Sequence, residues 1–462
     1  KKMSKKITLI LALAFLVGIA LPAFAEVQNV KVSGDITAYG IFRDEYDLNE
    51  TSGNTTTDNA AFYASIARVR IDADLTDNVQ TTIRLLNERP WEGEGDVEND
   101  IDLDLAYLTL KEFFYSPLTL TIGRQNLKFG TGLVVGDPDT NAQVAAGGLN
   151  NTIAEDLSAR KAFDAIRATL DYAPWTIDLI VAKISEVDTT GLGVGSEDED
   201  LLGVNVAYKF GQYNAEAEGY LFVKDSDTEG TSPSASAVPL TQAGDIYTVG
   251  LRGGLEPIKG LNLSGEVAYQ FGDAYKAPAG GTSRDQKAWA LDLDGSYTWD
   301  IQYAPSIGLG YSYRSGEEPG NTGDYEAWNP MYEDQTQGII ADYILAGVNG
   351  GVNSNANIIK VYGSIKPIKD ITLAAKYYNY RLDEKLVSSG TATRAYSAYP
   401  SREYTMRDKK DLGDEIDLIA TYNYTEDVQI GLSAGWFRPG DAFDNTNDDT
   451  ATSIIGSVKV VF

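Results

Sequence analysis

The 462-residue sequence contains neither cysteine nor histidine. Without cysteine the chain has no disulfide and no thiolate nucleophile. Without histidine it has no Ser-His-Asp triad, no Cys-His pair and no metal site built on imidazole ligands. These absences exclude the hydrolases and metalloenzymes that depend on a histidine or cysteine side chain. We therefore predict that the protein is not an enzyme and that it uses no cofactor and no metal.

The sequence also lacks long apolar runs beyond its N-terminus. Residues 1–25 combine a basic stretch, an apolar run of 15 residues (7–21) and an Ala23-Phe24-Ala25 cleavage site. This order is typical of a secretory signal peptide, and the run is shorter than the ~20 residues of a membrane anchor. No later segment has 18 consecutive apolar residues, which excludes helical membrane spans. We expect a signal peptide at 1–25 and one exported domain at 26–462.

Basic residues are scarce as well. The chain has 38 Lys and Arg against 67 Asp and Glu, for a net charge of −29. Removing residues 1–25 takes away four lysines and no acid, which leaves −33. Phosphate backbones attract basic surfaces, so this balance predicts that the protein does not bind nucleic acid.

What the sequence does contain is an alternation of apolar and polar residues. Along Lys287 to Trp299, Trp289, Leu293 and Trp299 alternate with small and acidic residues. Successive side chains of a strand point to opposite faces. A soluble sandwich strand also alternates, but an apolar stretch bracketed by aromatics is more typical of a membrane strand with interfacial girdles.

The same pattern recurs eighteen times, and the links between segments alternate short and long. Eight short links carry turn residues, whereas nine long links are rich in Asp, Gly, Asn, Ser and Thr. We therefore predict an all-β fold, a transmembrane antiparallel β-barrel of about 18 strands with short periplasmic turns and long extracellular loops. The segments start near residues 30, 62, 79, 101, 119, 163, 175, 201, 213, 246, 261, 287, 305, 357, 371, 414, 428 and 452.

The last segment, "IIGSVKVVF" (454–462), is predicted to be the closing strand of this barrel. Its apolar row would face lipid, and it would pair with the first strand around Val30 to Phe42 so that no edge stays open. An aromatic at the end of an alternating strand also resembles the signal read by the barrel-assembly machinery. The expected surroundings are lipid and lipopolysaccharide of the Gram-negative outer membrane.

The polar face of the alternating segments predicts which residues line a water-filled lumen. We give weight to a cationic strip of Arg68, Arg70, Arg84 and Arg167, because arginine suits bidentate contact with carboxylates. The alternative for most of these residues is that they pair across strands with acids. Arg252 is a further predicted pore-lining base, and the predicted pore-lining acids are Asp72, Asp171, Glu218, Glu266, Asp292 and Asp294, with Glu415 and Asp417 on the same face.

Two kinds of loop differ in composition from the other links. The segment "MYEDQTQGIIADYILAGVNGGV" (331–352) is too apolar for a solvated loop, and predicts either a short helix at the barrel mouth or a pore constriction. The acidic stretches 92–104, 196–200 and 441–449 have carboxylates suited to Ca²⁺. None matches a known calcium loop, so solvated loops bridged to lipopolysaccharide by divalent ions are the favoured interpretation.

Four stretches resemble the alginate-export family of outer-membrane porins. They are "TLTIGRQNLKFGTGLVVGDPDTN" (119–141), "RKAFDAIRATLDY" (160–172), "AWNPMYED" (327–334) and the hairpin 414–443 that ends in F-R-P-G-D-A-F. The resemblance implies an eighteen-stranded barrel and, through the G-R-Q and F-D-A-I-R motifs, adds Arg124 and Asp164 to the pore-lining residues and supports Arg167. Arg124 shares the strand face of Leu120 and Ile122, which conflicts with a place in the pore unless a bulge intervenes near Gly123 or Arg124 lies beyond the apolar band.

The leading functional hypothesis is a porin for passive diffusion of small polar or charged solutes and oligosaccharides, tuned by the inward charges. The alternative is dedicated export of an anionic, alginate-like polysaccharide through an arginine-lined pore. A barrel enzyme that relies on acids alone and a surface adhesin are further alternatives, and a conducting lumen would argue against both.

Overall fold

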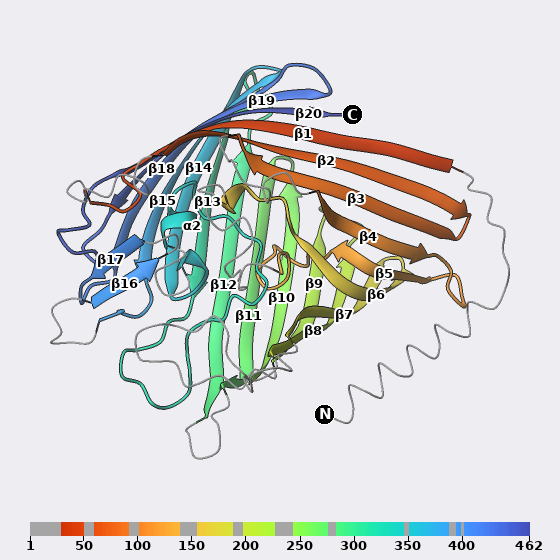
Figure 1. Ribbon diagram of the computed structural model, residues 1–462, viewed down its shortest axis with the longest axis horizontal. Coiled ribbons are helices and arrows are strands. Elements are labelled where there is room, and N and C mark those ends of the chain that lie inside the picture. Colours follow the sequence, from red (N-terminus) through yellow and green to blue (C-terminus); the bar gives the residue numbers. More distant parts are fainter. Residues whose placement is uncertain are drawn as a thin grey trace.

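A computed structural model describes residues 29–49, 60–91, 101–138, 155–187, 197–226, 244–275, 283–345, 351–387, 394–398 and 402–462. The predicted signal peptide (1–25) lies outside these residues. Eighteen strands form one antiparallel sheet in which each strand pairs with its neighbours in the chain. The sheet curls into a barrel, as the ribbon shows (Figure 1).

The observed strands start within four residues of the predicted ones, which confirms the count of eighteen. The strands of the barrel are β1 (Asn29–Asp44), β2 (Ala60–Thr76), β3 (Val79–Pro90), β4 (Asp102–Leu110), β5 (Leu118–Asn126), β6 (Ala162–Tyr172), β7 (Trp175–Val187), β8 (Glu197–Lys209), β9 (Glu216–Ser226), β10 (Gly244–Ile258), β11 (Leu261–Tyr275), β12 (Arg284–Thr298), β13 (Ser306–Arg314), β14 (Ala356–Ile368), β15 (Ile371–Leu382), β18 (Asp411–Asn423), β19 (Val428–Pro439) and β20 (Ala451–Val461).

The first and last strands close the barrel, as predicted. β1 and β20 pair antiparallel over ten residues, from Asp35 opposite Val461 to Asp44 opposite Thr452. Closure removes the unpaired backbone groups that an open edge would expose to lipid. The C-terminus therefore lies beside β1 (Figure 1).

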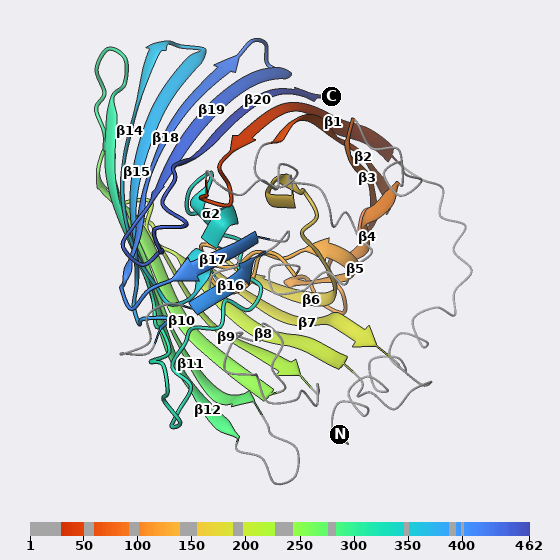
Figure 2. The same ribbon diagram turned by 60° about the vertical axis from the view of Figure 1, so that its left-hand side comes forward.

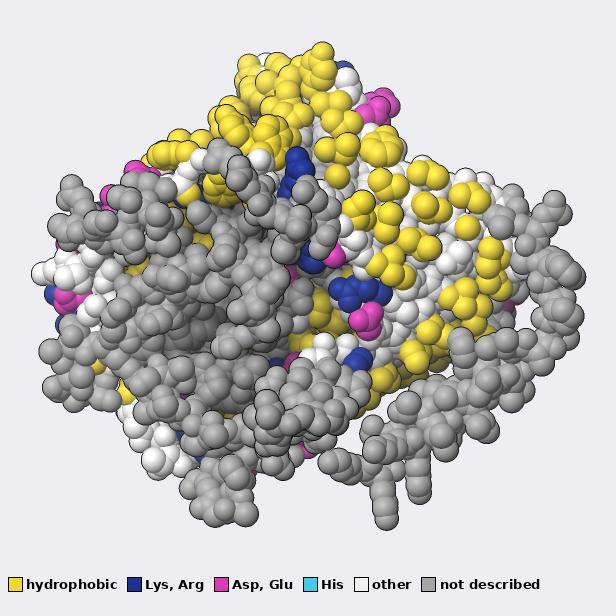
Figure 3. All heavy atoms as spheres, in the orientation of Figure 1, with side chains coloured by type: hydrophobic (Ala, Val, Ile, Leu, Met, Phe, Trp, Pro, Cys, Tyr) yellow, Lys and Arg dark blue, Asp and Glu magenta, His cyan; other side chains and the backbone are white. Residues whose placement is uncertain are grey.

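The outer face of the strands is apolar, whereas the inner face mixes charged, polar and small or buried apolar side chains. On β12, Trp289 and Leu293 are 52% and 49% exposed, whereas Ala288 and Ala290, on either side of Trp289, are buried inside. On β20, Ile454, Val458 and Val460 are exposed in the same way. Figure 3 shows hydrophobic side chains spread over the outer face of β1, β2 and β3. Lipid on one side and a polar interior on the other explain the alternation.

A small hairpin, β16 (Arg394–Ala398) with β17 (Arg402–Met406), belongs to a separate two-stranded sheet and was not predicted. It lies in the link between β15 and β18. Helical structure is confined to α2 (Ala341–Ile344) and the single 3₁₀ turns η2 (Glu155–Leu157) and η4 (Gly351–Asn353) within the described ranges. No helix of the described residues is long and apolar enough to cross a membrane.

Candidate functional site

Two long loops fold into the barrel and pack on each other. The first inward loop follows β5 and comprises residues 127–138 and 155–161; the second follows β13 and comprises residues 315–345. They form a parallel bridge between Val135 and Tyr332, where the Tyr332 N–H donates to Val134 O (3.0 Å) and the Gly136 N–H donates to Tyr332 O (2.7 Å). The first inward loop continues the family stretch 119–141 beyond β5 and the second contains "AWNPMYED", so these two family stretches meet inside the barrel through Val135 and Tyr332.

An apolar cluster fixes both loops to the wall. It joins Phe129 and Val135 of the first inward loop to Trp328 and Tyr332 of the second, all at most 5% exposed. The wall contributes small and aromatic side chains from the inner face, which leave room for the loops and bury them. These wall residues are Phe163, Ala165, Ile180, Ala182, Leu201, Tyr220, Phe222, Ala268, Ala288 and Ala290.

The segment 331–352 reaches the opposite wall through α2. The Glu415 carboxylate on β18 accepts the backbone N–H groups of Ile339 (2.6 Å), Ile340 (2.8 Å) and Ala341 (2.7 Å). Ile340, Ala341 and Ile344 are buried against Tyr378 and Tyr380 of β15, in a cluster that also contains Tyr404 and Met406 of the small hairpin. α2 lies within the ring of strands (Figure 2). Of the two expectations for this segment, the constriction of the lumen is the one that this inward position favours.

Two of the predicted pore-lining acids anchor the loops. Glu266 is 2% exposed and accepts the Thr131 N–H (2.9 Å), the Thr131 hydroxyl (2.8 Å) and the Tyr220 hydroxyl (2.7 Å). Asp292 accepts from the side chains of Arg314 and Gln335, each at 2.9 Å. Both acids therefore serve the inward loops, a role that no sequence pattern indicated.

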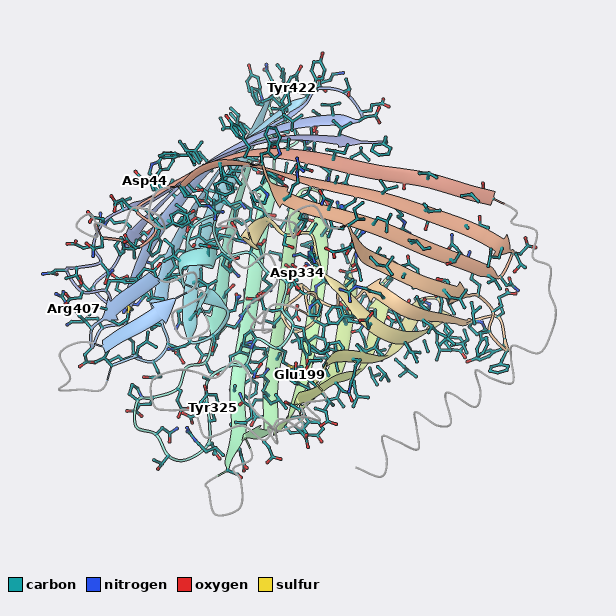
Figure 4. All side chains as sticks on the ribbon, in the orientation of Figure 1. Asp44, Glu199, Tyr325, Asp334, Arg407 and Tyr422 are labelled. Atoms are coloured by element: carbon teal, nitrogen blue, oxygen red, sulfur yellow. The ribbon has the colours of Figure 1, made fainter. Side chains whose placement is uncertain are left out.

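Asp334 ties the two loops together by charge. Its carboxylate accepts from Lys128 (2.7 Å) and from Lys161, both in the first inward loop. Burial raises the pKa of the Asp334 carboxyl, but the hydrogen bonds from the two lysines outweigh burial and hold the pKa below its usual value. Figure 4 labels Asp334 near the middle of the barrel.

The four arginines of the predicted cationic strip lie on the inner row and each one contacts a carboxylate. Arg68 donates to Asp35 (2.9 Å), Arg70 to Asp72 (2.8 Å), Arg84 to Asp104 and Arg167 to Asp178 (2.7 Å). The acids lie on the same or an adjacent strand, so each pair is close to neutral. This is the cross-strand pairing that the sequence left open as the alternative.

Arg252 and Asp294 are also paired with opposite charges, whereas Asp171, within the described part of the chain, is not. Arg252 bridges Glu216 (2.7 Å) and Glu218 (3.2 Å), and Asp294 pairs with Lys360 (3.3 Å). Asp171 lies on the inner row of β6 near the short turn to β7, without an ion pair to any described residue. The inner charges of these strands thus occur mostly as pairs of opposite sign on the same strand or on nearby strands.

Arg124 and Asp164, carried over from the family motifs, face the other way. The two residues are opposite each other on β5 and β6, and Arg124 Nη1 lies 3.1 Å from Asp164 Oδ2. The register of β6 is regular, and Asp164 is three residues from the inward Arg167, so it lies on the outer face. Their side chains are 37% and 62% exposed. The expectation that these two residues line the pore is wrong, because the motif does not change the alternation of its strand.

A cavity of about 320 Å³ remains between the inward loops and the wall formed by β18, β19, β20 and β1. Hydroxyl and amide groups of Tyr39, Thr421, Gln429, Ser433 and Ser457 line its wall side. Leu157 and Asp156 of the first inward loop and Thr336, Ile339 and Asp342 of the second line the other side.

The two carboxylates at this cavity have different partners. Asp156 receives two hydrogen bonds of 2.8 Å from Arg43, whose side chain is 1% exposed. Asp342 accepts the Gln337 N–H (3.2 Å) and forms no ion pair with any described residue. Burial, with smaller contributions from Asp156 and Glu415, raises the pKa of Asp342 to about 7, while the Gln337 N–H opposes the rise.

The acidic loops show no metal centre where they are described. Residues 92–100 and 196 lie outside the described ranges. Within the described part of the chain no group of three or more acidic side chains is placed to hold a metal ion. In the stretch 441–449, Asp444 instead pairs with Arg407 of the link before β18 (2.9 Å).

A known protein family and several solved structures share this architecture. A model of the family described as "Alginate export" matches residues 42–457. The chain belongs to the alginate export family. No curated protein sequence matches it. Family and fold together identify a β-barrel of the Gram-negative outer membrane with a channel or export role.

Solved structures share the fold at low sequence identity. OpdQ of Pseudomonas aeruginosa matches with a TM-score of 0.54 and 13% identity over 95% of this chain and 100% of its own. OccK2 (OpdF) of P. aeruginosa, in complex with glucuronate, gives 0.54 and 11% over 94% and 99%. A BenF-like porin of Pseudomonas fluorescens Pf-5 gives 0.55 and 10% over 94% and 100%. At these identities the likeness establishes the fold alone.

Proposed function

We propose that this member of the alginate export family is a passive channel for small polar solutes, with a preference for neutral and cationic ones. The solutes would pass between the inward loops and the wall of β18, β19, β20 and β1. The observation that carries the proposal is that the inner arginines are paired with acids, whereas one acid at the cavity is not paired with any described base. Each arginine of the inner strip contacts a carboxylate, whereas Asp342 faces the remaining cavity without a paired cation among the described residues.

Export of an anionic polysaccharide fits this arrangement less well. A polyuronate would need arginines that are free to make bidentate contacts with its carboxylates. The guanidinium groups of Arg68, Arg70, Arg84 and Arg167 already contact acids of the wall. A polymer would also meet the packed inward loops, which fill the lumen with side chains such as Trp328 and Tyr332.

Single-channel conductance in a planar bilayer tests the proposal. The refolded mature protein is measured under a KCl gradient, and polyuronate and glucuronate are then added. We expect open conductance, a reversal potential that indicates cation preference, and no block by either anion. Anion preference with block by micromolar polyuronate would support export of an anionic polymer instead, and the absence of conductance would contradict both.

Two further expectations stay predictions. We propose cleavage after Ala25 and recognition of the final strand by the barrel-assembly machinery. Mass determination of the protein isolated from outer membranes tests the first. Truncation of Phe462, followed by the yield of inserted barrel in cells, tests the second.

A further inference from the structure

The cavity beside the inward loops has the chemistry of a ligand site. A volume of about 320 Å³ is at the lower end of the range for pockets that hold small molecules. Its wall side offers hydroxyl and amide groups that both donate and accept hydrogen bonds, among them those of Ser433, Ser457 and Gln429. Leu157 and Ile339 add an apolar surface on the side of the inward loops. Polar groups opposite an apolar surface suit a ring that carries hydroxyls on its edge and C–H groups on its face.

One carboxylate at the cavity, that of Asp342, has no cation paired with it among the described residues. Asp156 is neutralised by Arg43, which is buried beneath it and lies over the rings of Tyr46 (5.3 Å) and Tyr343 (5.0 Å). Glu415 is occupied by three backbone N–H groups. Asp342 has a single N–H donor and no ion pair with the described residues. A cation in the cavity would supply the missing charge and the missing donors.

We infer that this cavity is a binding subsite for a monosaccharide-sized polyol that carries an ammonium group, such as a hexosamine. The ammonium would pair with Asp342, and the ring hydroxyls would bond to the wall of β18, β19, β20 and β1. This inference rests on the proposed function, because the ligand would reach the subsite through the channel. Asp342 is thereby a specificity-determining residue, one that distinguishes cationic from neutral sugars.

Block of single-channel current by sugars tests the subsite. Glucosamine, N-acetylglucosamine, glucose and glucuronate are each titrated against the open channel at pH 7.5, where much of the glucosamine still carries its ammonium. We expect glucosamine to block at concentrations at least tenfold below those of the two neutral sugars, and glucuronate not to block. Because a charge-assisted contact is lost, Asp342→Asn should weaken glucosamine block about tenfold or more and leave the neutral sugars unchanged.

Two other variants serve as controls. Asp164→Asn removes an acid from the outer face and should leave conductance and block as in the parent. Ser433→Leu keeps Asp342 but fills the cavity, and should reduce conductance and abolish block. Retained mobility difference between heated and unheated samples on a gel verifies that each variant forms a barrel.

The outcomes separate the subsite from the channel. Equal block by glucose and glucosamine would overturn the role of Asp342, and open conductance without block by any sugar would overturn the subsite while the proposed function stands. An absence of conductance would overturn the proposed function itself.

Discussion

Gly34 and Phe462 close the barrel by a reciprocal pair of backbone hydrogen bonds. The Gly34 N–H donates to Phe462 O at 2.9 Å, and the Phe462 N–H donates to Gly34 O at 3.0 Å. The phenyl ring also approaches Gly34 closely. A Cβ placed on Gly34 would lie 2.7 Å from Cζ of Phe462 and 2.5 Å from the backbone oxygen of Arg68. The seam therefore depends on the absence of a side chain at position 34.

Gly34→Val tests this requirement. The added side chain has to displace the ring and the backbone of β2, and overpacking of this kind costs about 1–3 kcal/mol. We expect a lower folded yield and a lower temperature of unfolding, measured from the mobility of heated samples. Gly211→Val is the matched control, since a Cβ at Gly211 would meet nothing within 4 Å. Equal stability of the two variants would contradict the closing role of Gly34.

Glu415→Gln tests the attachment of α2. The substitution keeps the size of the side chain but replaces one acceptor oxygen with an NH₂ group that faces backbone donors. Because bonds to a charged acceptor contribute about 1.5–3 kcal/mol each, we expect the second inward loop to leave the wall more often. Single-channel recordings should then show larger and noisier currents than the parent.

The matched control for the loop is Glu426→Gln, in the short turn between β18 and β19. It makes the same chemical change far from α2 along β18 and should leave the current unchanged. If the two variants show equal current noise, Glu415 does not hold the loop.

The paired state of the arginines predicts how ion selectivity responds to substitution. Asp72 neutralises Arg70 and also accepts the Thr82 hydroxyl (2.6 Å). Asp72→Asn should leave Arg70 unbalanced and move the reversal potential toward anion preference, whereas Arg70→Ala should move it toward cation preference. The double variant should return close to the parent value. Single variants that both match the parent would show that this pair lies off the ion path.

The strands could be predicted from the sequence because every strand has the same two environments. Lipid outside and polar surroundings inside force an alternation that β12 shows from Trp289 onward, and turn residues mark each reversal. The same alternation placed Arg124 with Leu120 and Ile122, on the outer face that the structure gives it. The family motif predicted that Arg124 lines the pore, and this prediction was wrong. A motif identifies a residue, but the alternation of the strand determines which face its side chain occupies.

The ion pairs and loop contacts inside the lumen could not be predicted from the sequence in this way. Arg68, Arg84 and Arg167 find their acids through strand register, so the partners Asp35, Asp104 and Asp178 could not be assigned from spacing. The apolar character of 331–352 indicated burial, but its anchor, Glu415, is 75 residues from Ile340 along the chain. Non-local contacts of this kind leave no periodic signal.

The pKa of Asp342, about 7, makes sugar block depend on pH in a range that is easily measured. The pKa is raised, so the carboxyl is protonated below about pH 7 and charged above it. The ammonium of glucosamine needs the charged form. We therefore expect block by glucosamine to strengthen as pH rises from 6 to 7.5 and to weaken at higher pH as the ammonium loses its proton, while block by glucose stays constant. Other charged groups near Asp342 are Asp156, Lys161 and Glu333 on the inward loops, Arg43 on β1, and Glu415 and Asp417 on β18.

Glu333 needs a control of its own, because its pKa is also raised, to about 8, by burial and by the charge of Asp342. Glu333 accepts the Gln335 N–H (2.7 Å) and the Asn353 amide (2.6 Å), so its ionisation above pH 8 would alter the loop itself. Glu333→Gln should keep the rise in glucosamine block between pH 6 and 7.5, and Asp342→Asn should remove it. A pH dependence that persists in Asp342→Asn and disappears in Glu333→Gln would assign the titration to Glu333, and the subsite would lose its charge-selecting group.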